Sequence, residues 1–464
     1  MSKSNFMSDA EWMRDNLGHS MCLAKWKQVS LHLPTGLNNS CYHPPLHEIQ
    51  EAPLIFNPSA LHNTDYKKQQ RKLMKEGIRP DECAYCWSAE DNNQLSDRHY
   101  RSGEPWAADE FDNIMAMPWN QDITPSYVEV NFSHGCNLAC SYCSPQFSSE
   151  WGKEIDSLGA YPTSTPHNAP EHFQGRRKPI PVREENPYVE AFWRWWPTLY
   201  GSLRHFRMTG GEPLMDKNTY KVFDYVLAIP KSDLHIDVTS NFSVEDKLFI
   251  KYLDKVKDLC TGEKIEHFMQ YVSLDTGIMK HAEYIRSGLN AERMASNVNT
   301  FLTEVPYRNS LTFIVTMNNL GLLGLRDLLD WVLDLRKKHS STYQRVWFDT
   351  PLLRQPTWQS LQILPESYYA ILESAIDFMK LHKLEEGSDK FDGFKDYEIQ
   401  RMERNLAWMK NGKDLPQEYI TQNRADFYRF FNEYNKRRGL DFLTIFPQMK
   451  EFWNECKWYA ENNI

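Results

Sequence analysis

Short strand patterns alternate with helical ones through the middle of this chain, and this alternation constrains the fold more than any other feature. It is typical of βα units, in which helices connect the parallel strands of one sheet. The predicted fold class is therefore α/β, and six such units would form a partial barrel that is open on one side. The six predicted strands are Tyr127–Phe132, Leu203–Thr209, Leu234–Thr239, Phe268–Leu274, Leu311–Met317 and Arg345–Thr350.

A cluster of three cysteines follows the first predicted strand. Cys136, Cys140 and Cys143 have C-x3-C-x2-C spacing, and Tyr142 stands directly before the third cysteine. A loop of this length can place three thiolates around one face of an iron–sulfur cluster. The fourth iron would then lack a protein ligand, and an open coordination position usually serves a substrate or a cofactor. The alternatives are a chance cysteine loop and a zinc site.

A glycine-rich turn follows the second predicted strand. Gly210 and Gly211 let the backbone approach a ligand closely, and Glu212, which precedes Pro213, carries a carboxylate that can accept hydrogen bonds from an ammonium group. Further polar residues end the third and fourth strands or follow them, and for each of these a polar strand cap is the alternative to a ligand contact. They are Ser240, Asn241, Ser273, Asp275 and Arg286.

Four further cysteines lie in the N-terminal part of the chain. Residues 26–41 predict a β-hairpin with a turn at 34–36, which would bring Cys22 and Cys41 close together. Cys83 and Cys86 add a C-x2-C pair. Four thiolates can hold a closed zinc site or a fully ligated iron–sulfur cluster, and the spacing alone does not separate the two.

The cysteine loop with Tyr142, followed one strand later by the turn at 210–213, resembles the radical S-adenosylmethionine (SAM) enzymes. The resemblance implies a partial (β/α)6 barrel over residues 120–355 and a [4Fe–4S] cluster whose open iron chelates SAM. It also implies that the turn grips the SAM amino group, and that the polar strand-end residues named above make further SAM contacts. In such enzymes one electron cleaves SAM, and the resulting 5′-deoxyadenosyl radical takes a hydrogen atom from the substrate.

The four N-terminal cysteines, with Gly36 between the first two, resemble the SPASM/twitch pattern that holds an auxiliary cluster in many radical SAM enzymes. The later cysteines of the full SPASM pattern are absent, so the shorter twitch form fits best. Such modules more commonly follow the barrel, whereas here a small α+β module, residues 1–115, precedes it. The resemblance implies a second [4Fe–4S] cluster, with zinc or a [2Fe–2S] cluster as the alternatives. A closed cluster suits electron transfer, so we expect it to remove an electron from a substrate radical.

The face of the strands that points into the predicted barrel is polar. Ordinary barrel interiors are filled by Val, Ile and Leu, and a buried charge without a partner is costly. This polarity predicts a bound polar ligand, although internal pairing of Arg207 with Glu129 or Asp237 is the alternative. The residues on this face are Glu129, Asn131, His205, Arg207, Thr209, Asp237, Thr239, Ser273 and Asp275.

Two segments outside the βα pattern complete the predicted organisation. Residues 151–187 form a long loop rich in Pro, Gly and Ser, and because long ordered loops are usually functional, we interpret it as a lid or substrate loop. Residues 356–464 predict a helical extension that covers the open side of the barrel or contacts the N-terminal module. Within it, residues 436–438 are interpreted as a solvated or helix-capping basic cluster. The predicted helices of this extension are Leu364–Leu381, Tyr397–Lys410, Tyr419–Lys436 and Gln448–Tyr459.

The composition limits which binding partners and which cellular compartment are expected for this protein. The net charge of −9 argues against a general nucleic-acid surface, which requires a basic face. No apolar run approaches the roughly 18–20 residues that a membrane span requires, and the first residues lack the apolar core of a signal peptide. Seven of the nine cysteines lie in clusters, which suits metal ligation in a reducing cytoplasm. We therefore expect a cytoplasmic protein.

The resemblance also implies a reducing electron donor of the flavodoxin or ferredoxin type, but it leaves the substrate open. Relatives with such modules often modify ribosomally made peptides, and others oxidise or epimerise small molecules such as aminoglycosides. We see no peptide-recognition segment ahead of the cysteine module, which keeps a small polar substrate open. A non-catalytic iron–sulfur or zinc-binding protein is the alternative from another class, and the turn at 210–213 argues against it because an electron carrier needs no SAM grip.

Overall fold

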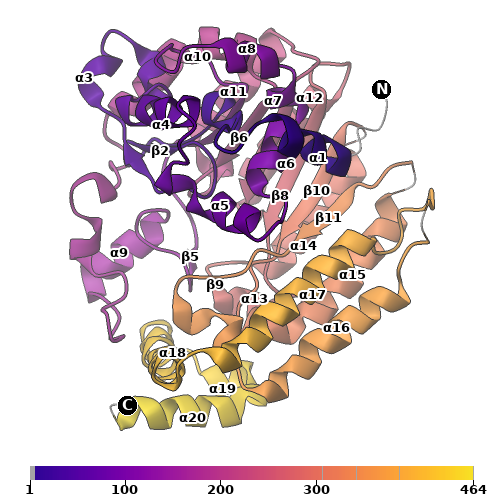
Figure 1. The fold of residues 1–464 in the computed structure, drawn as a ribbon. Helices are drawn as coiled ribbons and strands as arrows, with labels where there is room; N and C mark the ends of the chain where they lie inside the picture. The colour runs from indigo at the N-terminus through magenta and orange to yellow at the C-terminus, as the bar shows by residue number, and fades with distance from the viewer. Residues whose placement is uncertain (1–5, 306, 341, 386, 463–464) are drawn as a thin grey trace.

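A nine-stranded sheet forms the centre of the computed structural model, which describes residues 6–305, 307–340, 342–385 and 387–462 (Figure 1). The strand order is β11-β10-β8-β7-β6-β4-β1-β2-β3, so the sheet is open between the edges β11 and β3. The predicted α/β class with a parallel sheet is confirmed, because the six predicted strands run side by side in chain order and pair in parallel. They are β4 (Tyr127–Asn131), β6 (His205–Thr209), β7 (His235–Ser240), β8 (His267–Ser273), β10 (Asn309–Ile314) and β11 (Val346–Asp349).

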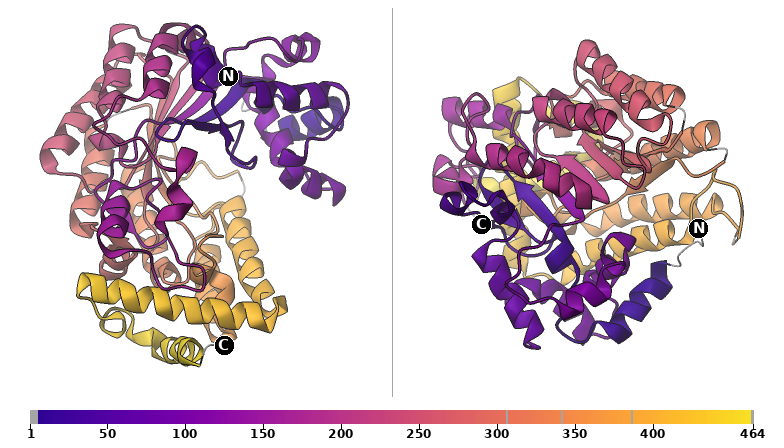
Figure 2. Two further views of the ribbon diagram at one scale, coloured as in Figure 1. Left: turned by 90° about the vertical axis from the view of Figure 1, so that its left-hand side faces the viewer. Right: turned by 90° about the horizontal axis from the view of Figure 1, so that it is seen from above.

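Helices pack along one face of this sheet (Figure 2). Alternate residues of the strands point toward them, and in β8 the side chains of Phe268, Gln270 and Val272 are fully buried there. Burying a side chain of the size of Phe or Val stabilises the fold by about 1.5–3 kcal/mol. The helices that connect the parallel strands are α10 (Pro187–Ser202), α11 (Lys217–Ala228), α12 (Asp246–Cys260), α14 (Ala291–Glu304) and α15 (Leu325–His339).

The predicted N-terminal hairpin exists, and it also extends the central sheet. β1 (Gln28–His32) pairs with β2 (Leu37–Asn39) in antiparallel orientation, and Gly36 closes the turn with a φ of +64°. The other edge of β1 pairs in parallel with β4. The hairpin is therefore continuous with the sheet rather than confined to a separate module.

A small hydrophobic cluster of its own holds the rest of the N-terminal residues together. Its side chains come from short helices that include α1 (Phe6–Asn16), α4 (Asp65–Lys75), α7 (Pro105–Ala108) and α8 (Phe111–Ala116). Its buried aromatic members are Trp26, Trp106 and Tyr127. The helices α5 (Ala84–Asp91) and α6 (Asp97–Gly103) complete this part of the chain.

The long segment between β4 and β6 differs in part from the prediction. Ser149–Leu158 forms the helix α9, whose first turn is capped by the Ser148 hydroxyl. Its buried face consists of Trp151 and Ile155, and so few apolar positions give a weak periodic signal in the sequence. The remainder, residues 159–186, contains only short 3-10 turns and the bridge between Tyr161 and His167.

The C-terminal residues form the predicted helices. α16 (Tyr369–Leu381) and α17 (Asp396–Lys410) lie beside α15, whereas α18 (Gln417–Arg438) and α20 (Lys450–Glu461) form the end of the molecule seen at the bottom of Figure 1. A fully buried ion pair between Arg336 of α15 and Glu398 of α17, at 2.6 Å, joins this extension to the sheet domain. None of the helices in the described ranges combines the length and apolarity that a membrane span requires.

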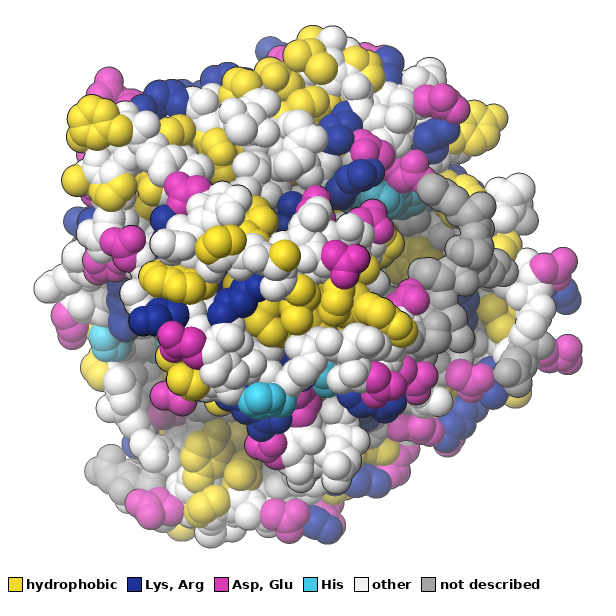
Figure 3. All heavy atoms as spheres, turned by 45° about the horizontal axis from the view of Figure 1, so that its top comes forward, with side chains coloured by type: hydrophobic (Ala, Val, Ile, Leu, Met, Phe, Trp, Pro, Cys, Tyr) yellow, Lys and Arg dark blue, Asp and Glu magenta, His cyan; other side chains and the backbone are white. Residues whose placement is uncertain are grey.

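Acidic and basic side chains are interspersed on the face of the molecule that Figure 3 shows. Some exposed pairs lie on single helices, such as Arg326 with Asp330 of α15. Exposed pairs of this kind contribute at most about 1 kcal/mol each. The stability of the fold therefore comes mainly from the buried apolar side chains.

Candidate functional site

The loop with three cysteines begins where β4 ends, at the carboxyl edge of the parallel sheet. Its short strand β5 (Ala139–Cys140) pairs with β9 (Arg286–Ser287), and the indole N–H of Trp151 donates to the Cys140 carbonyl at 2.8 Å. Burial, followed by the charge of Cys140, raises the pKa of the Cys143 thiol to about 12. A metal must therefore displace the thiol proton when it binds.

Hydrogen bonds between backbone groups join the glycine-rich turn after β6 to the cysteine loop. The Gly211 N–H donates to the Ser133 carbonyl at 3.1 Å, and the Glu212 N–H donates to the Gly135 carbonyl at 2.7 Å. A Cβ on Gly211 would lie 2.2 Å from the Gly135 oxygen. Gly210 has a φ of +125°, and a Cβ there would lie 2.1 Å from Asn131 Oδ1. Both positions thus require glycine.

The Glu212 carboxylate joins this turn to the end of β7. It is buried and accepts hydrogen bonds from Leu214 N–H at 3.0 Å, Ser240 Oγ at 2.8 Å and Asn241 N–H at 2.8 Å. Burial raises the pKa of Glu212 to about 7, against the opposing effect of these donors. A carboxylate offers about four acceptor positions, so three protein donors leave about one for a ligand. The Asn241 amide also donates to Asn137 Oδ1 at 2.8 Å, which ties β7 to the cysteine loop.

Three of the predicted ligand residues form one buried group behind Cys140. The Arg286 guanidinium pairs with Asp275 at 2.9 Å and donates to the Tyr142 hydroxyl at 2.6 Å. The Tyr142 hydroxyl in turn donates to Asp275 at 3.0 Å. Arg286 Nη1 also donates to the Cys140 sulfur at 3.7 Å. Ser273, the remaining predicted residue on β8, is half-buried at the end of that strand.

The structure brings the four N-terminal cysteines to a single pocket. Cys22 precedes α2 (Ala24–Lys27), Cys41 follows β2, and Cys83 and Cys86 lie at the start of α5. Within the described ranges, no three Cys, His, Asp or Glu side chains converge closely enough to hold a single metal ion. Besides the cysteines, the pocket is lined by residues that include Lys25, Tyr42, His43, Trp87, Arg98 and Arg101.

A pair of tyrosines connects this pocket with the inner face of the sheet. Tyr42 lines the pocket, and its hydroxyl lies 2.9 Å from the hydroxyl of Tyr127, the first residue of β4. The Arg101 guanidinium lies over both rings, 5.0 Å and 5.7 Å from their centroids. Tyr127 stacks on His205 of β6 at 4.4 Å. No local sequence pattern predicts this pair, and the only signal for it is that Tyr42 directly follows Cys41.

The predicted polar face of the strands is present, and its charges are paired across neighbouring strands. Arg207 Nε lies 3.4 Å from Glu129 Oε2, and its guanidinium lies 4.3 Å from the centroid of the Tyr271 ring. His205 Nε2 lies 2.6 Å from Asp237 Oδ2. These charges are therefore paired with one another, which was the alternative to a bound polar ligand.

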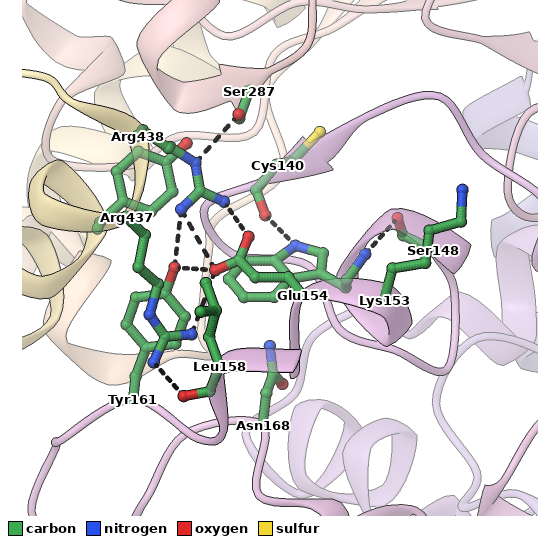
Figure 4. A network of polar contacts seen from close by, with 12 residues as sticks. Cys140, Ser148, Lys153, Glu154, Leu158, Tyr161, Asn168, Ser287, Arg437 and Arg438 are labelled. Atoms are coloured by element: carbon green, nitrogen blue, oxygen red, sulfur yellow. Dashed lines mark hydrogen bonds and ion pairs between the residues drawn. The ribbon is translucent and has the colours of Figure 1, made fainter. Parts of the chain in front are cut away.

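Of the three basic residues at the end of α18, Lys436 is solvated as predicted, whereas Arg437 and Arg438 are largely buried (Figure 4). Arg438 pairs with Glu154 of α9 at 2.6 Å, and Arg437 donates to the carbonyls of Gly159 and Ala160. Tyr161 and Glu154 are also hydrogen-bonded. The end of α18 thus holds α9 against the outside of the cysteine loop.

Sequence comparison finds no protein family and no curated protein that match this chain. Comparison of the fold with solved structures finds SuiB of Streptococcus suis, in one crystal structure bound to the precursor peptide SuiA and in another bound to S-adenosylmethionine. Each is 13% identical to this chain with a TM-score of 0.35, and the alignments cover 73% and 76% of this chain. The chain spans 65% of the first SuiB chain, just under two thirds of its length, and 68% of the second. Structural similarity this low does not indicate a function, so the function must be inferred from the residues of the site.

Proposed function

We propose that this chain is a radical SAM enzyme whose [4Fe–4S] cluster is held by Cys136, Cys140 and Cys143. The observation that carries the proposal is the bonding between three loops that are far apart in the sequence. The cysteine loop, the turn at 210–213 and the end of β7 meet at the carboxyl edge of the sheet, through Gly135–Glu212 and Asn137–Asn241. Active sites of parallel α/β folds lie at this edge.

The residues present fit the cluster and its ligand. The three half-buried thiols lie on one loop, an arrangement that suits the ligands of one iron–sulfur cluster. When bound, the cluster supplies the electron that cleaves SAM and so starts hydrogen abstraction. The glycines at 210 and 211 keep the neighbouring backbone free of side chains, and the Glu212 carboxylate has an acceptor position for the SAM ammonium group. Ser240, Asn241, Asp275 and Arg286 then hold the surrounding loops in place.

The proposed substrate is polar, because the inner face of the sheet is lined by the charge pairs Glu129–Arg207 and Asp237–His205 rather than by apolar side chains. A peptide is our first candidate, and a sugar-like or aminoglycoside-like small molecule that is dehydrogenated or epimerised is the second. A flavodoxin-type or ferredoxin-type protein is the proposed electron donor.

The pocket of Cys22, Cys41, Cys83 and Cys86 is proposed to hold a second, fully ligated cluster, as in a twitch module. Four thiolates can hold either a zinc ion or a fully ligated iron–sulfur cluster, and the resemblance to the twitch pattern favours the cluster. The Tyr42–Tyr127 contact offers a short route for an electron from the inner face of the sheet to this pocket. The second centre would thus accept an electron from the substrate.

Iron and sulfide quantitation after anaerobic reconstitution tests this proposal. We expect about eight irons per wild-type chain and about four in the Cys136→Ala/Cys140→Ala/Cys143→Ala variant, because each [4Fe–4S] centre holds four. The wild type should also convert SAM to 5′-deoxyadenosine in the presence of dithionite, and the triple variant should not. Cys260→Ala, at a buried cysteine outside both sets, is the control and should behave as wild type. Iron binding without SAM cleavage would favour a non-catalytic iron–sulfur protein, and bound zinc would favour a zinc-binding protein.

A further inference from the structure

Two fully buried cations lie on α4, behind the pocket of the four N-terminal cysteines. Lys67 and Arg71 both have 0% exposure. Lys67 Nζ donates to the Gln28 carbonyl at 2.8 Å and lies 3.0 Å from Nδ1 of His62. Arg71 donates to the Lys25 carbonyl at 3.2 Å and to the Asn63 side-chain oxygen at 3.1 Å. The acceptors in these four contacts are all neutral groups.

The cations that line the pocket itself are different, because each has a carboxylate partner. Lys25 is paired with Glu82, Arg98 with Glu90 at 2.6 Å, and Arg101 with Glu104 at 2.8 Å. The residues that line the pocket therefore add little net positive charge.

The carboxylates whose charges act on the two buried side chains already have partners of their own. Glu82 and Asp122 act on the charges of Lys67 and Arg71 respectively, but Glu82 pairs with Lys25, and Asp122 pairs with Lys68 at 2.5 Å. Burial lowers the pKa of both side chains, that of Lys67 well below its usual value and that of Arg71 to about 9. The charge of Lys67 interacts with the Cys41 thiol, and Arg71 bonds to the backbone of Lys25, which lines the pocket. A buried charge without a counter-charge is costly to a fold, so a negatively charged group in the pocket would stabilise the charged form of both side chains.

We propose that Lys67 and Arg71 are the built-in counter-charges of the metal–thiolate centre in this pocket, and that they raise its reduction potential. The inference rests on the proposed second cluster. Four thiolates around a [4Fe–4S] core in its oxidised form carry a net charge of about −2, which two cations balance.

Reduction of the centre adds one more negative charge, so nearby buried cations favour the reduced form. Charge and burial around a cluster are among the factors that set its potential. The centre is thereby tuned to accept an electron, which suits its position beside Tyr42. Lys67 and Arg71 act through this field and are positioning residues, not catalytic ones.

The test is a redox titration of the auxiliary centre in the full-length Cys136→Ala/Cys140→Ala/Cys143→Ala protein, with dithionite as the reductant and electron paramagnetic resonance as the readout. Lys67→Met in this background should shift the midpoint potential to a more negative value, and Lys67→Arg should leave it close to the parent. Lys72→Met is the matched control, because Lys72 lies on the same helix with a side chain that is 41% exposed. The midpoint potential of the auxiliary centre in Lys72→Met should equal that of the parent.

Each outcome separates this inference from the proposed function. A potential that is equal in the Lys67→Met, Lys67→Arg and parent proteins would overturn the counter-charge role and leave the second cluster in place. A triple-alanine parent that binds zinc or no metal would overturn both. If Lys67→Met binds no iron, the same titration is made with Arg71→Lys and Arg71→Gln. The charged variant Arg71→Lys should keep the midpoint potential of the parent, and the neutral variant Arg71→Gln should lower it. Equal midpoint potentials in these two variants would overturn the inference.

Discussion

Arg286 contacts residues from two other parts of the sequence, the three-cysteine loop and the segment that follows β8. Its guanidinium meets the fully buried carboxylate of Asp275, the Tyr142 hydroxyl and the sulfur of Cys140. A hydrogen bond and a positive charge at a ligand sulfur are among the means by which proteins set the potential of an iron–sulfur cluster. The resemblance to radical SAM enzymes predicts that Arg286 contacts SAM, which stays a prediction, and the structure shows that the same side chain contacts the three-cysteine loop.

Arg286→Gln should destabilise the protein by about 3–5 kcal/mol, because it leaves the Asp275 carboxylate buried without its counter-charge. Denaturant unfolding measured on the apoprotein gives this value directly. Arg293→Gln breaks an exposed pair with Asp246 and should cost less than about 1 kcal/mol. A loss for Arg286→Gln no greater than for Arg293→Gln would show that Asp275 is stabilised by other groups.

Glu212 should make the stability of the apoprotein depend on pH. Its pKa is raised by burial from 4.5 to about 7, so between these values the folded chain binds more protons than the unfolded chain. The free energy of unfolding should therefore fall as the pH rises through this window, by at most about 1.4 kcal/mol per pH unit, and be level above it. The difference between wild type and Glu212→Gln, measured by unfolding at a series of pH values, isolates this effect. A difference that does not vary with pH would contradict the assignment.

At the scale of elements, residues 159–186 form a strap between distant parts of the chain. One end is held by α18, where Ser164 N–H donates to Asp426 at 2.8 Å. The other end is held by the N-terminal hairpin, where Ile180 N–H donates to the Pro34 carbonyl at 2.8 Å. Just beyond the second anchor, the side chain of Val182 approaches the position that a Cβ on Gly135 of the cysteine loop would occupy, at 3.5 Å.

Because the strap passes over the cysteine loop, SAM bound there should order it. Trypsin cleavage after Arg177, an exposed residue of the strap, should slow several-fold when SAM is added to the reconstituted protein. The rate of cleavage at this bond can be followed by mass spectrometry. The Cys136→Ala/Cys140→Ala/Cys143→Ala variant is the control and should show no change with SAM. Equal rates in every state of the wild type would argue against a lid.

At the scale of the whole molecule, the two cysteine sites lie on either side of the polar face of the sheet. The three-cysteine loop sits at the carboxyl edge after β4, and the four-cysteine pocket is reached through Tyr127 at the first residue of the same strand. Each site is built from its own side chains. They should therefore load independently.

Cys83→Ala/Cys86→Ala should lower the iron content from about eight to about four per chain. The rate of 5′-deoxyadenosine formation with SAM and dithionite should stay within about twofold of wild type, because none of the residues proposed to bind SAM is altered. Cys456→Ala, at a buried cysteine in α20, is the matched control. Loss of 5′-deoxyadenosine formation in a variant that keeps the fold and four irons would show that the two centres are coupled.

The sequence by itself determined the features that depend on neighbouring residues. The six parallel strands and the C-terminal helices follow from hydrophobic periodicity, which is local. The cysteine spacing and the turn at 210–213 are also local, and the requirement for glycine at 211 is explained by the contact with Gly135. The sequence predicted as well that four distant cysteines would come together, because the hairpin brings Cys22 and Cys41 close.

Only the tertiary structure decided which groups meet across long sequence distances. Pairing of β1 with β4, the Arg286–Cys140 contact and the burial of Arg438 against Glu154 depend on packing between elements that no local pattern encodes. The same holds for Lys67 and Arg71, which the sequence places on a Lys-rich helix and the fold buries completely. Charged side chains are usually solvated, so their burial becomes visible only when the surrounding elements are in place.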